Sequence, residues 1–159
     1  MIAKGLSIQG NGSYHQEQLA FFNFTTTYGG AAFVHIKTNI GTISTGDGGS
    51  IVTIEGTGYN YGQGLPIRCH WTAYTSTSSD IVYTVGLGSH ESSGAQAHGI
   101  YKSSDNYVVL RCYFPSSAYF AGLVLNAYSG PRFVKYGSVE VLDSILIPTG
   151  SPNDSGSHY

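Results

Sequence analysis

The chain has 159 residues, a formal net charge of −2, and charged side chains at only 10 % of its positions. Its length suits a single domain, its hydrophobic content of 41 % excludes a disordered chain, and its scattered basic residues argue against nucleic acid as a partner. Because exposed helix faces normally carry Glu, Lys and Arg, so few charges, together with 22 glycines and 13 tyrosines, predict an all-β protein.

The N-terminal residues are polar and rich in Gly and Asn. We expect residues 1–18 to lead into a β-sandwich domain over residues 19–148, followed by a polar C-terminal tail over residues 149–159. Met1–Gly12 has one Lys and no continuous apolar stretch, which is not the pattern of a secretory signal. No apolar run approaches the roughly 20 residues of a membrane span, so no membrane insertion is expected.

Short aromatic and β-branched segments then alternate with turn signals. This spacing predicts a sandwich or barrel of jelly-roll size. The expected strands are Leu19–Thr26, Ala32–Thr38, Ser50–Glu55, Pro66–Tyr74, Ile81–Val85, Gly99–Lys102, Tyr107–Phe114, Tyr119–Tyr128 and Arg132–Leu142, with Ile145–Ile147 as a possible last strand. Between them, Gly56–Gly64 and Gly86–His98 are expected to be loops.

The segment Pro66–Tyr74 has the clearest alternation. Residues with odd numbers are mostly apolar and those with even numbers are polar, so the two sets are expected on opposite faces of one strand. The alternation predicts Trp71 as a core anchor. Cys69 and Cys112 both alternate with apolar residues and are predicted to be buried free thiols, while a disulfide between them stays open.

The sequence predicts no catalytic residues, no metal site and no cofactor. Ser is abundant, but no nucleophile elbow is present. His90, Glu91 and His98 share one loop, yet the two histidines lie too far apart for the usual ligand spacings. The carboxylates that could in principle form a pair for glycoside cleavage are Glu55, Glu91, Asp105, Glu140 and Asp143, and nothing in the sequence brings two of them together.

The two predicted loops are the candidate binding surface, because long loops on a rigid β-scaffold usually carry recognition. The candidate residues are Tyr59, Asn60, Tyr61, Gln63, His90, Gln96 and His98. Tyrosine rings can stack on sugar faces, and neutral amides can bind hydroxyl groups, so recognition is expected to depend little on salt. The alternative is structural, with the tyrosines packed over a barrel mouth or a subunit seam.

Several short sequence segments, here called phrases, follow one another in an order that resembles the β-rich distal domain of bacteriophage tail fibres. They are Phe22–Thr26, His35–Thr38, Ile54–Gly56, Gly58–Gly62 and Tyr101–Leu110, and the likeness covers about Leu19–Ser129. The resemblance implies a compact β-sandwich of the complement/tumour-necrosis jelly-roll type. It also implies three copies about an axis, with exposed loops that touch the host surface, and no catalytic residues.

We therefore expect a virion structural protein, a homotrimeric receptor-binding domain of a tail fibre that attaches to a host-surface glycan or protein. Low charge leaves much neutral surface for a trimer to cover. The protein would be made in the host cytoplasm and released by lysis. Because the domain begins almost at Met1 and not after a shaft, one alternative is a capsid decoration protein that contacts other virion proteins. A second alternative is a surface-polysaccharide hydrolase.

Overall fold

The computed structural model describes residues 7–10, 13–24, 31–42, 51–60, 65–75, 81–88, 98–114, 121–129, 139–152 and 158–159. Side chains are described for residues 31–42, 53–58, 68–74, 99–114, 122–127, 139–152 and 158–159. The described residues form ten strands: β1 (Ser7–Gly10), β2 (Ser13–Phe24), β3 (Ala32–Gly41), β4 (Ile51–Asn60), β5 (Leu65–Thr75), β6 (Ile81–Gly88), β7 (His98–Lys102), β8 (Tyr107–Phe114), β9 (Ala121–Ser129) and β10 (Val141–Pro148).

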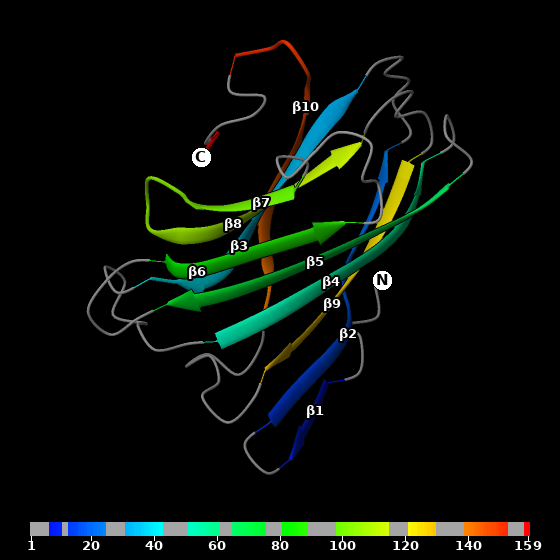
Figure 1. The fold of residues 1–159 in the computed structure, drawn as a ribbon. Helices are drawn as coiled ribbons and strands as arrows, with labels where there is room; N and C mark the ends of the chain where they lie inside the picture. Colours follow the sequence, from blue (N-terminus) through cyan, green and yellow to red (C-terminus); the bar gives the residue numbers. More distant parts are fainter. Residues whose placement is uncertain are drawn as a thin grey trace.

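The strands form two antiparallel sheets (Figure 1). Six strands make one sheet, in the order β1-β2-β9-β4-β5-β6, and four make the other, in the order β10-β3-β8-β7. No helix occurs in the part of the chain that the structure describes, so the all-β prediction is confirmed there. The arrangement is consistent with the predicted β-sandwich.

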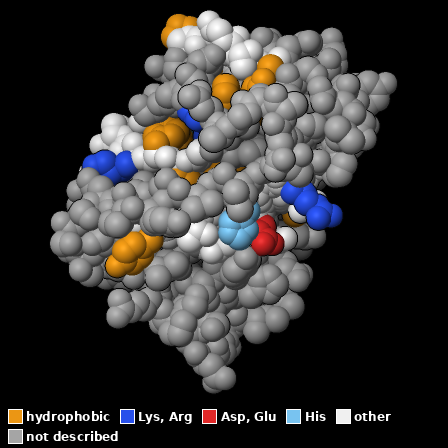
Figure 2. All heavy atoms as spheres, in the orientation of Figure 1, with side chains coloured by type: hydrophobic (Ala, Val, Ile, Leu, Met, Phe, Trp, Pro, Cys, Tyr) orange, Lys and Arg blue, Asp and Glu red, His pale blue; other side chains and the backbone are white. Residues whose placement is uncertain are grey.

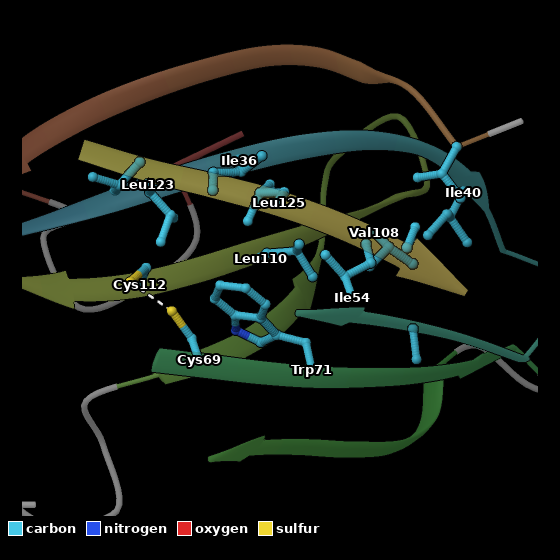
Figure 3. Packing of buried hydrophobic residues seen from close by; sticks show 14 of the residues in the cluster. Ile36, Ile40, Ile54, Cys69, Trp71, Val108, Leu110, Cys112, Leu123 and Leu125 are labelled. Atoms are coloured by element: carbon cyan, nitrogen blue, oxygen red, sulfur yellow. Dashed lines mark hydrogen bonds between the residues drawn. The ribbon is translucent and has the colours of Figure 1, made fainter. Parts of the chain in front are cut away.

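The hydrophobic core lies between the two sheets, because alternate side chains of each strand point toward the opposite sheet (Figure 3). Its members include Val34, Ile36, Ile40, Leu110, Cys112 and Phe114 from the four-stranded sheet, and Ile54, Cys69, Trp71, Leu123 and Leu125 from the six-stranded sheet.

Trp71 joins the two sheets, as the sequence predicts for a core anchor. Its side chain is fully buried, and its indole Nε1 donates a hydrogen bond of 3.3 Å to the carbonyl oxygen of Arg111 on β8. The neighbours of Trp71 on β5 confirm the predicted faces. Cys69 is buried on the same side, whereas His70 and Arg68 retain exposed surface on the other.

Strand structure begins earlier than the sequence predicts. Within the polar segment 1–18, β1 pairs with β2 from Ser7 opposite Gln16 to Gly10 opposite Ser13. β1 has β2 as its neighbour and stands at the edge of the described sheet. Backbone hydrogen bonds across such a hairpin do not require apolar side chains. The polar composition of this segment therefore gave no strand signal in the sequence.

The first part of the predicted loop Gly56–Gly64 belongs to β4, so that prediction is wrong for residues 56–60. β4 pairs with β5 on one side and β9 on the other along this stretch, which places it inside the sheet. A Cβ atom on Gly58 would overlap the carbonyl oxygen of Gly122, and one on Gly56 would crowd Cys69. Close approach of neighbouring groups therefore explains these glycines.

The C-terminal part also differs from the prediction. One strand, β10, covers Val141–Pro148 where the sequence predicts the end of one strand and a second short one, and residues 131–138 lie outside the described residues. The pairing of β10 with β3 is interrupted by a register shift between Val141 and Asp143. β6 likewise continues to Gly88, past its predicted end at Val85.

The close approach at Gly58 generates a test of the fold. We expect Gly58→Ala to lower the free energy of unfolding by about 3 kcal/mol, because the added methyl group forces β4 away from β9. The control is Gly150→Ala. Gly150 has φ +85° and no neighbour within 4 Å of an added Cβ, so only backbone strain of about 1 kcal/mol is expected. Urea denaturation midpoints measure both, and a Gly58→Ala midpoint equal to that of the unmodified protein would contradict the close approach.

Candidate functional site

Three strands of the six-stranded sheet bring polar side chains into one row on its outer face. The register places Glu55 on β4 opposite Asn126 on β9 and opposite His70 on β5. Because Ile54 and Gly56 are buried, alternation turns Glu55 away from the core. Neighbouring strands lie about 4.8 Å apart, so the row extends about 10 Å across the sheet.

Close contacts connect the row to two threonines. Glu55 Oε1 lies 3.4 Å from His70 Nδ1, and the side chains of these residues are 49 % and 37 % exposed. His70 Nε2 lies 3.4 Å from the hydroxyl of Thr72, which in turn lies 3.2 Å from the hydroxyl of Thr53. We call Asn126, Glu55, His70, Thr72 and Thr53 the polar row. Figure 2 shows one face of the molecule, on which a histidine side chain lies beside an acidic one.

The polar row is suited to binding. Carboxylate, imidazole, amide and hydroxyl groups together offer both hydrogen-bond donors and acceptors to a polar ligand. The order carboxylate, imidazole, hydroxyl is also that of a catalytic triad. Acyl transfer further needs backbone N–H groups aimed at the developing oxyanion. Around Thr72 the backbone is engaged in ladders with both β4 and β6, so the flat sheet does not offer such donors there.

The sequence-predicted binding residues are only partly within the described structure. Tyr59 and Asn60 end β4, opposite Pro66 and Leu65 of β5, and their side chains are not described. His98 begins β7 with its backbone opposite Cys112. The remaining predicted binding residues, Tyr61, Gln63, His90 and Gln96, lie outside the described residues.

The described strand ends that flank the two predicted segments lie toward one end of the sheets. Gly88, the last residue of β6, is opposite Cys69, and His98, the first of β7, is opposite Cys112. The sulfur atoms of these two cysteines are 3.4 Å apart, so β6 ends and β7 begins at the same level of the two sheets. The end of β4 lies toward this same end in Figure 1.

A second cluster lies on the outer face of the four-stranded sheet, where the C-terminal residues meet β3 and β7. The Tyr101 hydroxyl lies 2.9 Å from His35 Nδ1 and accepts a hydrogen bond of 3.0 Å from the His158 backbone N–H. The carbonyl oxygen of Tyr159 accepts a hydrogen bond from the Ser104 N–H. His35 is fully buried. We call His35, Tyr101, His158 and Tyr159 the C-terminal cluster.

Lys37 joins this cluster to the turn between β7 and β8. Its ammonium group forms an ion pair with Asp105 and lies 5.4 Å from the centre of the Tyr159 ring and 5.7 Å from that of Tyr107. Hydrogen bonds from Lys37 and then from Ser103 hold the pKa of Asp105 below its usual range. The cation is thus held between a carboxylate and two aromatic faces.

The phrases that carry the resemblance have a structural explanation in this region. His35–Thr38 on β3 and Tyr101–Leu110 over β7 and β8 meet across the sheet. Within the second phrase, the Ser103 N–H donates to the Tyr107 carbonyl oxygen, and Asn106 has φ 70°. The turn needs residues that accept positive φ and that bond to their own backbone, which Asn and Ser do. These phrases therefore encode a hairpin and its partner strand.

The described residues contain no group of three or more His, Cys, Asp or Glu side chains that could hold a metal ion. In the same part of the chain, no helix is long and apolar enough to cross a membrane. Comparison with known protein families, with curated proteins and with solved structures found no match to this chain.

Sequence reasoning missed the polar row as a site, although it placed His70 on the correct face of its strand. It also considered Glu55 only as one of several scattered acids. The pairing of Glu55 with His70 depends on the register between β4 and β5, which single-strand alternation does not give. The C-terminal cluster was missed because His35 and Tyr101 are separated by 66 residues.

The C-terminal cluster predicts a loss of stability in alkali. Burial, and then the nearby Asp143 carboxylate, raise the pKa of Tyr159 well above 10.0, and burial raises the pKa of Tyr101. Unfolded tyrosines ionise near 10.0, so the contribution of both phenols is complete below about pH 10 and is lost as the pH rises further. We expect Tyr159→Phe, which keeps the ring beside Lys37, to lose less stability than the unmodified protein above about pH 10.

Urea midpoints at neutral pH and at about pH 11 measure this difference. Tyr113→Phe on the same sheet is the matched control for removing one tyrosine hydroxyl. An equal decrease of the urea midpoint between neutral pH and about pH 11 in the unmodified protein and in Tyr159→Phe would show that Tyr159 does not contribute to the loss of stability in alkali.

Proposed function

We propose that this protein is a non-enzymatic receptor-binding module of a bacteriophage tail fibre that attaches to a glycan on the host surface. The order of sequence phrases that resembles such domains supports this proposal, as do the two antiparallel sheets, which suit a jelly-roll sandwich of the complement/tumour-necrosis type. The observation that carries the binding role is the polar row, a partly exposed set of donors and acceptors held by three paired strands.

The chemistry of the polar row suits a polyhydroxylated ligand. Sugar hydroxyls both donate and accept hydrogen bonds, and Glu55, His70 and Asn126 supply both kinds of partner. The strands fix the spacing of these groups before binding, so little conformational entropy is lost on association. Tyr59 on β4, and Tyr61, which follows β4 in the sequence, can add ring contacts to the same ligand class.

A trimer completes the proposal. β10 stands at the edge of the four-stranded sheet in the described strand order, and its residues Leu142 and Ile145 are 48 % and 37 % exposed. Among the described strands β10 pairs with β3 alone, and a sheet edge with exposed aliphatic side chains is a surface that subunits cover. Three copies about an axis close such surfaces without leaving an open end.

Binding to bacterial surface glycans tests the receptor-binding proposal. The unmodified chain is measured by biolayer interferometry against purified lipopolysaccharides and capsular polysaccharides from a panel of bacteria. Loss of a hydrogen bond to a charged group typically weakens binding roughly 10-fold or more, so we expect that effect from Glu55→Gln and from His70→Ala. Added salt should change the affinity little. Glu140→Gln, an exposed acid outside the polar row, is the matched control and should bind normally.

Other outcomes identify the alternatives. No binding to any glycan, with binding to purified capsids, would replace the proposal by a decoration protein. Release of reducing ends from the polysaccharide would replace it by a hydrolase. Binding that survives Glu55→Gln and His70→Ala, but is lost in a Tyr59→Ala, Tyr61→Ala double variant, would move the site to the end of β4.

The oligomeric state is measured separately by light scattering after size-exclusion chromatography. We expect a homotrimer at micromolar concentration. Replacing Leu142 and Ile145 together with Lys should yield monomers, because it charges the edge surface, whereas Glu140→Lys beside it should remain trimeric. A stable monomer of the unmodified chain would contradict the trimer.

A further inference from the structure

Two cysteines face each other across the core. Cys69 on β5 and Cys112 on β8 belong to different sheets, and their Sγ atoms are 3.4 Å apart (Figure 3). Both are buried, with 3 % of Cys69 and 0 % of Cys112 exposed. They are the only cysteines of the chain. The contact joins residues that are 43 positions apart in sequence.

Cys69 Sγ also packs closely against Gly56 on β4. Gly56, opposite Cys69 on β4, has no side chain, and a Cβ atom there would lie only 3.1 Å from Cys69 Sγ. A disulfide has an S–S distance near 2.05 Å, so closure requires the sulfur atoms to approach by about 1.4 Å. Rotation of both cysteine side chains about their Cα–Cβ bonds can bring the two sulfur atoms together.

We propose that Cys69 and Cys112 form a redox-active dithiol that a small oxidant of the hydroperoxide class converts to a disulfide linking the two sheets. In the first step hydrogen peroxide oxidises the Cys69 thiol to a sulfenic acid and is reduced to one water. In the second step the Cys112 sulfur attacks the Cys69 sulfur, the S–S bond forms and a second water leaves. Two thiols and one peroxide thus give one disulfide and two waters.

Burial makes this conversion slow and selective. Burial raises the pKa of the Cys112 thiol, and the nearby Cys69 raises it further. The thiolate is the attacking species, so it is scarce near neutral pH. Large disulfide reagents cannot reach sulfur atoms that lie inside the core, whereas a molecule as small as a peroxide can enter through local opening of the strands. The reaction should therefore accelerate as the pH rises.

The disulfide would link the two sheets at the level where β6 ends, opposite Cys69, and β7 begins, opposite Cys112. A cross-link between residues this far apart restricts the unfolded chain and slows separation of the sheets. Under the reducing conditions of a cytoplasm the dithiol form persists. Release by host lysis is part of the proposed function, and this step rests on it. On that basis the disulfide forms only after the particle has left the cytoplasm and reached an oxidising medium.

Intact-mass measurement of the full chain before and after peroxide treatment tests the proposal. We expect a loss of about 2 Da, the mass of two hydrogens. Peptide mapping without reductant should find residues 69 and 112 on linked peptides. The melting temperature should rise by roughly 5–15 °C, as a disulfide in a chain of this size does, and a thiol reductant should reverse the change.

Cys69→Ala and Cys112→Ala serve as controls, each compared with its own untreated sample so that loss of core packing does not enter the result. Neither should lose the 2 Da or gain stability; if Cys112→Ala does not fold, Cys112→Val replaces it. Disulfide-linked dimers, oxygen adducts as the only products, or a linked chain without higher melting temperature would each overturn the proposal. The measurement needs no receptor, so failure of glycan binding leaves it unaffected.

Discussion

Everything else in this structure depends on the packing of two inner sheet faces around Trp71. The indole ring fills the space between β5 and β8 and also bonds to the β8 backbone. Together with the other buried residues of the core, this side chain sets the spacing of the sheets, and densely packed interiors tolerate little displacement. The contact between Cys69 and Cys112 follows from it, because each cysteine lies on a strand that Trp71 joins to the other. The core therefore also decides which strand ends meet at the same level.

Once the inner faces are buried, the two outer faces have different roles. The outer face of the six-stranded sheet keeps Glu55 and His70 partly exposed, and rigid backbone pairing holds them at a fixed spacing. The outer face of the four-stranded sheet buries His35 and holds Lys37 between aromatic rings, with the C-terminal residues beside it. We interpret the first face as a surface for a ligand. The second is a surface where the chain's own C-terminal residues already contact Tyr101 and Lys37.

The fold class and several strands could be predicted from the sequence because alternation is a local property. Pro66–Tyr74 has apolar residues at every second position, and the structure buries Cys69, Trp71 and Ala73 of that set. The prediction failed where local composition opposed strand formation. The glycines of β4 have weak strand propensity, but β5 and β9 pair with them from both sides. The polar residues of β1 lack a hydrophobic pattern, and the hairpin with β2 forms a strand from them through backbone bonds.

The sequence by itself determined that the described part of the chain is all-β, that Trp71 and both cysteines are buried, and that His70 lies on the outer face of its strand. These properties depend on the order of apolar and polar residues within single strands, and that order can be read directly from the sequence. Tertiary structure alone decided that Glu55 meets His70, that Tyr101 meets His35, and that the two thiols face each other. Each of these contacts depends on strand order and register, and the free energy that selects them comes from residues far apart in sequence packing together.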